Sequence, residues 1–137
     1  MWKYYAVLSA VFAALTAILA KIGVRNVDSN LATAIRTAVI LVITWGIVFV
    51  SGSGARIRSV PGYSLLFLVL SGVSTGLSWL FYFKALQSGP ASKVAPIDKL
   101  SVALTIFLGI LILHERCDWQ VVAGGLLILA GSMVLLL

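Results

Sequence analysis

Five long apolar stretches constrain this chain more than any other feature of its sequence. A helix needs about 20 mainly apolar residues to cross the hydrocarbon core of a membrane. The stretches run over residues 4–20, 31–50, 63–83, 94–113 and 119–137. Apolar and polar residues do not alternate within them, and each stretch is about twice the length of a membrane β-strand. We therefore predict an all-α integral membrane protein with five transmembrane helices.

The composition agrees with this prediction. Of the 137 residues, 61% are hydrophobic and 10% are charged, against about 45–50% and about 25% in soluble domains. The length leaves room for one compact domain, residues 1–137. The net charge of +6 comes from basic residues that flank spans, so nucleic-acid binding is not expected. The first stretch could instead be a secretory signal, but it continues to Lys21 without a small-residue cleavage site.

Short polar connections separate the stretches and predict antiparallel neighbours. Asp28 is expected to cap the second helix and Asp118 the fifth, because carboxylates accept hydrogen bonds from free backbone N–H groups. Pro96 allows two interpretations. It lies harmlessly in the first turn if Ser92 caps the fourth helix, and it bends that helix beside Asp98 if the helix starts earlier.

Three charged residues lie inside the stretches, namely Arg36, Asp98 and Lys99. Such charges are costly in lipid and usually face a bundle interior or an aqueous cavity. Neighbouring helix residues point about 100° apart, so Asp98 and Lys99 are not expected to pair within one helix. Arg36 and Asp98 have similar predicted depths of roughly 7–8 Å. An Arg36–Asp98 bridge is therefore possible, and it would leave Lys99 unmatched.

Polar and aromatic residues recur at helical spacing in the third and fourth stretches. The two sets are Ser71, Thr75, Ser78 and Tyr82, and Asp98, Ser101 and Thr105. Trp79 is three residues before Tyr82, so these two aromatic residues can flank one pocket. Either these hydroxyls bond to packed helices and to their own backbone, or they line a polar cavity. The fifth stretch instead presents Gly124, Gly125 and Gly131, which predicts a helix for packing or dimer formation.

Basic residues are balanced across the membrane. One side has Lys3, Arg56, Arg58 and Arg116, and the other has Lys21, Arg25, Lys84 and Lys93. An excess of Lys and Arg normally fixes orientation, so this chain is predicted to insert both ways. Two copies in opposite orientations would form an antiparallel homodimer with inverted symmetry. The single Cys117 allows no disulfide within the chain.

Two parts of the sequence carry a family resemblance. The run Tyr82–Ser101, with His114–Arg116 before a glycine-rich last helix, resembles the EamA domain of the drug/metabolite transporter superfamily. The segments Ala20–Gly23 and Val27–Thr37 are similar to its short, single-domain bacterial and archaeal members. The resemblance covers essentially the whole chain. It implies one half of a ten-helix inverted-repeat transporter, paired with a second copy or a paralogue, in which four helices of each half surround a cavity.

The expected function is therefore secondary transport of small metabolites or drugs across the cell membrane by alternating access. Arg36 and Lys99 would attract an anionic group, and Asp98 would pair with them or carry a proton. Cavity-lining candidates are Ser78, Trp79, Tyr82, Ser101 and Thr105. We expect no catalytic residue, metal or cofactor, and no enzyme activity. The alternatives are an accessory membrane subunit and a flippase for lipids or lipid-linked sugars.

Overall fold

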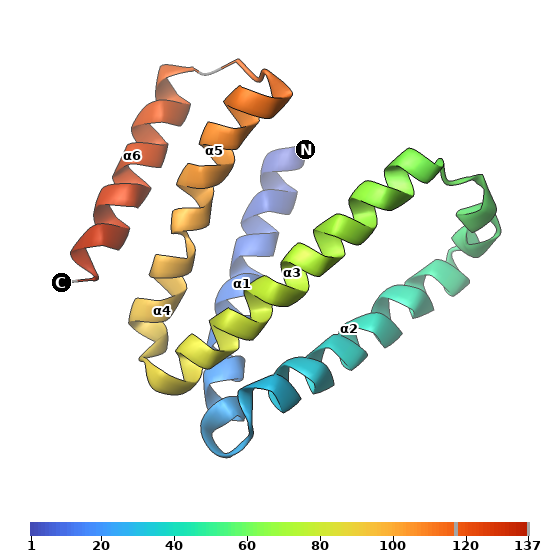
Figure 1. The fold of residues 1–137 in the computed structure, drawn as a ribbon, viewed down its shortest axis with the longest axis horizontal. Helices are drawn as coiled ribbons and strands as arrows, with labels where there is room; N and C mark the ends of the chain where they lie inside the picture. Colours follow the sequence, from blue (N-terminus) through green and yellow to red (C-terminus); the bar gives the residue numbers. More distant parts are fainter. Residues whose placement is uncertain (117, 137) are drawn as a thin grey trace. The chain divides into compact units, whose positions relative to one another are not determined.

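The computed structural model describes residues 1–116 and 118–136, and these residues form helices and no strand (Figure 1). Cys117 lies outside the described residues. The elements are α1 (Trp2–Gly23), η1 (Val24–Asn26), α2 (Ser29–Val50), η2 (Ser53–Ser59), α3 (Gly62–Ser88), α4 (Ala91–Asp98), α5 (Leu100–Leu113) and α6 (Trp119–Val134). The predicted all-α class is confirmed.

Four helical stretches of the described chain are long and apolar enough to cross a membrane. They are α1 with η1, α2, α3, and α4 with α5. The helix α6 is also apolar but has 16 residues. Each predicted helix is present, and the fourth differs from the prediction in being broken into two.

The break in the fourth span lies at Lys99, three residues after Pro96. The helix α4 starts directly after Pro90, so Pro96 lies inside it, and the second interpretation of this proline is correct. Proline lacks the N–H that would bond to the carbonyl four residues earlier, which is that of Ser92. The hydrogen bonds around Lys99 span three residues, with the Lys99 N–H 3.0 Å from the Pro96 oxygen and the Val102 N–H 2.9 Å from the Lys99 oxygen. This tighter bonding is typical of helix interruptions.

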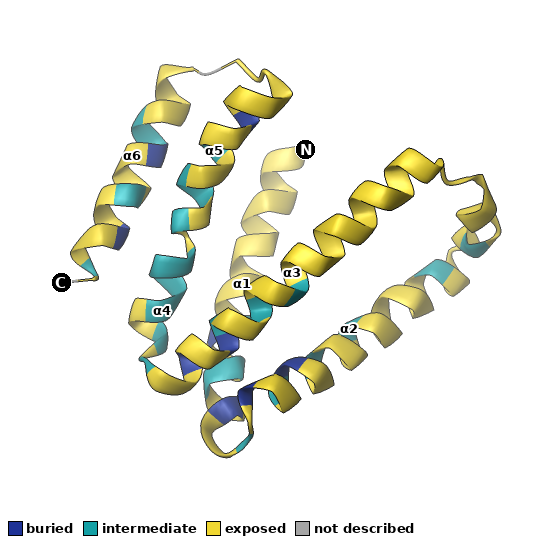
Figure 2. Cartoon of the chain, viewed as in Figure 1, coloured by how far each residue is buried: buried dark blue, intermediate teal, exposed yellow. Residues whose placement is uncertain are grey.

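The described residues form two units, Ala20–Gln87 and Met1–Leu19 with Ser88–Leu137. The first of these has a small core of five buried side chains, which belong to Val24, Ser29, Thr33, Phe83 and Leu86. They belong to η1, the start of α2 and the end of α3, where Figure 2 shows buried segments in dark blue. Hydrogen bonds close the same region, from Gln87 Nε2 to the Val27 oxygen at 3.0 Å and from Lys21 Nζ to the Leu86 oxygen.

In the other unit, α5 packs along α6. Gly125 is buried, and a Cβ there would lie 2.9 Å from Ile106 Cδ1. A Cβ on Gly124 or Gly131 would meet no described atom within 4 Å. Gly125 thus packs α6 on α5 within the chain. A role for Gly124 and Gly131 in a dimer stays a prediction.

The two predicted helix caps have different outcomes. Asp28 Oδ1 accepts hydrogen bonds from the N–H groups of Asn30 at 2.9 Å and Leu31 at 3.2 Å, so its capping role is confirmed. Asp118 occupies the cap position of α6, but its side chain makes no capping hydrogen bond. The prediction for Asp118 is wrong because the residue type sets only the propensity, while the rotamer decides whether the bond forms.

This difference supplies a matched pair of variants. Replacing Asp28 by alanine should lower the free energy of unfolding by about 1 kcal/mol, because two N–H groups of α2 lose their acceptor. Asp118→Ala should change it by much less. Thermal unfolding in detergent, followed by circular dichroism, measures both. Equal effects of the two substitutions would contradict the assignment of the cap.

Candidate functional site

Arg36 lies on α2 and contacts aromatic rings of α3. Its Cζ is 4.5 Å from the ring centroid of Trp79 and 5.3 Å from that of Phe83. The side chain is half-buried, and its Nη1 is buried without a hydrogen-bond acceptor among the described residues. Aromatic faces attract cations, and the attraction is strongest where water is excluded. The two rings therefore offset part of the cost of holding a guanidinium in an apolar span.

The spacing on α3 explains why two rings reach one cation. Trp79 and Phe83 are four residues apart and so lie one above the other on one face of the helix. Tyr82 lies beside them, with its ring centroid 6.3 Å from that of Phe83 and the planes at 71°. Trp79 and Tyr82 were candidates from the sequence, and Phe83 was missed. The spacing of four between Trp79 and Phe83 was the signal that could have found it.

Asp98 and Lys99 pair with each other at the break between α4 and α5. Lys99 Nζ lies 3.5 Å from Asp98 Oδ2, and the side chains are 54% and 37% exposed. The prediction that neighbours cannot pair is therefore wrong. It assumed a continuous helix, whereas Lys99 lies between two helices, and its long flexible stem can turn toward the preceding residue. Arg36 and Asp98 belong to different units, so a bridge between them stays a prediction.

The charged residues lie deeper in their spans than the sequence predicted. Arg36 is the eighth residue of α2, which starts at Ser29, and Asp98 is the eighth residue of the stretch that starts at Ala91. At about 1.5 Å per residue this is roughly 10 Å from each start. The depths expected from the sequence were too small because α2 begins two residues before the apolar stretch 31–50, and α4 begins three residues before the stretch 94–113.

The remaining candidates carry hydroxyl groups. Ser78, Ser101 and Thr105 are exposed. Thr105 Oγ1 donates to the Ser101 oxygen at 2.8 Å, and Thr75 Oγ1 donates to the Ser71 oxygen at 2.9 Å. These threonines therefore satisfy their donors on their own helices, as one of the two interpretations held. Their role in lining a cavity stays a prediction.

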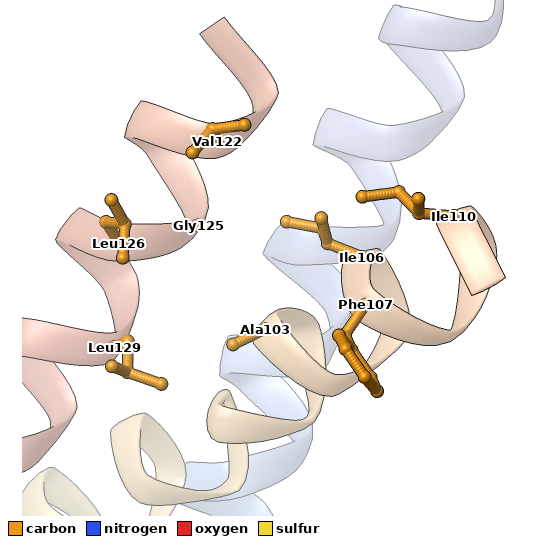
Figure 3. Close-up of a pocket in the computed structure, with 8 residues that line it drawn as sticks. All are labelled: Ala103, Ile106, Phe107, Ile110, Val122, Gly125, Leu126 and Leu129. Carbon is orange, nitrogen blue, oxygen red and sulfur yellow. The ribbon is translucent and has the colours of Figure 1, made fainter. Parts of the chain in front are cut away.

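An apolar pocket lies between α5 and α6 and contains none of the substrate candidates. Its volume is about 200 Å³, and its lining residues, labelled in Figure 3, are Ala103, Ile106, Phe107, Ile110, Val122, Gly125, Leu126 and Leu129. None of these lining residues has a polar or charged side chain that could bind an anionic ligand. No group of three or more His, Cys, Asp or Glu residues suited to a metal ion occurs within residues 1–116 and 118–136.

Comparison with known proteins identifies the family. Residues 1–137 match the EamA-like transporter family. A protein from Sinorhizobium sp named "Uncharacterized transporter in cobO 3'region" is 46% identical over 134 residues, which are 98% of this chain and 95% of that protein. No solved structure matches the chain. With its apolar helices, the chain is a multi-pass membrane transporter and not an enzyme. The chain belongs to the EamA-like transporter family.

Proposed function

We propose that residues 1–137 form a single EamA-like domain that acts as half of a secondary transporter for small metabolites or drugs. Two such halves would work by alternating access as a dimer. The observation that carries this proposal is the Asp98–Lys99 pair at the break between α4 and α5. Secondary transporters commonly bind substrates and coupling ions at interrupted spanning helices.

The exposure of this pair supports a passage for water beside it. Both charges lie within an apolar stretch, and the described chain leaves the Lys99 side chain 54% exposed and the Asp98 side chain 37% exposed. Each charge would cost about 2.5–3.5 kcal/mol in contact with lipid. Backbone N–H and C=O groups that a helix break leaves unpaired are also costly in lipid, because lipid offers them no hydrogen bonds. A water-filled passage beside the break would solvate both the charged side chains and these backbone groups.

The pairing also suggests how an anion and a proton are coupled. While Asp98 is ionised, it neutralises Lys99 at 3.5 Å. A proton on Asp98 removes this competition and leaves the ammonium available to an anionic substrate. Arg36 is proposed as a second cation for the substrate, and Ser78, Trp79, Tyr82, Ser101 and Thr105 are proposed as cavity-lining residues. The proposed coupling ion is the proton, and no other cofactor is required.

The second half of the transporter is proposed to be a second copy in the opposite orientation, or a paralogue. The equal numbers of basic residues outside the spans, four on each side, support dual insertion. Reporter fusions at the C-terminus should give signals on both sides of the membrane. A signal on one side only would leave a paralogue as the partner and remove the antiparallel homodimer.

A ligand screen tests the proposed function directly. The purified protein would be heated with a panel of small anionic, cationic and neutral metabolites, and hits would be tested for uptake into proteoliposomes. We expect stabilisation by small organic anions and uptake that a proton gradient accelerates. Movement of lipids or lipid-linked sugars between leaflets, without uptake of a soluble hit, would instead assign a flippase. Absence of ligands and of transport would indicate an accessory subunit.

A further inference from the structure

Ser132 on α6 makes a hydrogen bond to a different helix. Its Oγ donates to the Pro96 oxygen of α4 at 3.0 Å, and the side chain is 4% exposed. Serine and threonine in membrane helices usually bond to the carbonyl four residues earlier in their own helix. The residues Thr33, Thr37, Thr44, Ser74, Thr75 and Thr105 do so.

The acceptor of this bond lies at the break itself. The Pro96 oxygen also accepts the Lys99 N–H at 3.0 Å. This N–H bond spans three residues, and such bonds have poorer geometry than α-helical ones. Ser132 therefore supplies a second donor to a carbonyl in the last turn of α4.

The same face of α6 contacts the helix on the other side of the break. Gly125 and Ser132 are seven residues apart, so they lie on one face about 10 Å from each other along the axis. Gly125 packs against Ile106 of α5, while Ser132 bonds to α4. One rigid helix thus touches both halves of the broken span, and Asp98 and Lys99 lie between the two contacts in sequence.

We infer that Ser132 is a positioning residue of the transporter. Its hydrogen bond holds the break between α4 and α5 in the arrangement that places Asp98 and Lys99. The helix that the sequence marked as a packing element therefore takes part in transport. This inference rests on the proposed function for its consequence in transport, while the hydrogen bond can be tested by itself.

The test uses three variants of the full chain and two measurements that need no substrate. Ser132→Ala removes the donor, and Ser132→Cys keeps nearly the same size with a much weaker donor. Ser74→Ala is the matched control, because Ser74 donates within its own helix at 3.0 Å. Hydrogen–deuterium exchange followed by mass spectrometry reports opening of the break. Labelling of Asp98 by dicyclohexylcarbodiimide reports the accessibility of its carboxyl group.

We expect exchange in peptides that cover residues 97–104 to rise about threefold in Ser132→Ala and Ser132→Cys, as for loss of an average hydrogen bond between membrane helices. Carbodiimide labelling of Asp98 should rise with it, while Ser74→Ala changes neither. Unchanged exchange in Ser132→Ala, or a wild-type result for Ser132→Cys, would overturn the inference, since packing alone would then explain the contact. Faster exchange with unchanged Asp98 labelling would overturn the positioning role. None of these results depends on transport, so a failure of the proposed function would be recognised separately.

Discussion

Replacing Arg36 by alanine should lower transport at least about tenfold and also destabilise the contact between α2 and α3. The guanidinium lies over two rings of α3, at 4.5 Å from Trp79 and 5.3 Å from Phe83. A desolvated cation–π contact is worth about 2 kcal/mol. A charge-assisted hydrogen bond to an anionic substrate is worth about 1.5–3 kcal/mol, which corresponds to a loss of about tenfold to a hundredfold in affinity.

Two further variants separate these roles of Arg36. Arg36→Lys keeps the charge but loses the planar group that stacks on the rings. It should therefore retain part of the substrate affinity and lose most of the stability that the rings supply. Arg25→Ala removes an exposed charge of η1 and should affect neither. Uptake into proteoliposomes and thermal unfolding measure the two effects. Wild-type transport by Arg36→Ala would remove Arg36 from the substrate site.

The positions of the helices could be predicted because each depends on a local run of apolar residues. The break in the fourth span could not, since it depends on where α4 begins. A cap at Ser92 would have placed Pro96 harmlessly in the first turn, whereas the start at Ala91 places it inside the helix. The Asp98–Lys99 pair was missed for the same reason, because the break is what brings the two side chains together.

The contacts of Arg36 and Ser132 illustrate a different limit. Helical periodicity shows which residues share a face, and it grouped Trp79 with Tyr82 on α3. It does not show which other helix that face meets. The stacking of Arg36 on Trp79 and the bond from Ser132 to Pro96 join residues 43 and 36 positions apart. Such pairs depend on the packing of several elements at once, and only the structure reveals them.

Replacing Asp98 by asparagine should abolish acceleration of uptake by a proton gradient while leaving the protein folded. The pair with Lys99 is 37% and 54% exposed, and partly exposed pairs contribute at most about 1 kcal/mol to stability. The asparagine cannot be ionised at any working pH, so Lys99 would stay available to an anion throughout. Exchange of labelled substrate across the membrane should therefore continue, and its rate should no longer change with pH.

Lys99→Gln supplies the complementary result, because it removes the ammonium that the anion would contact. Substrate affinity should fall about tenfold to a hundredfold at every pH. In the double variant, adding Asp98→Asn to Lys99→Gln should cause little further change, since the carboxylate would have no ammonium left to compete for. Asp118→Asn is the control for loss of an acidic group, because the Asp118 side chain makes no capping hydrogen bond at the start of α6. If Asp98→Asn kept its response to a proton gradient, Asp98 would not carry the coupled proton, and the exposed charges at the break would have to serve the substrate alone.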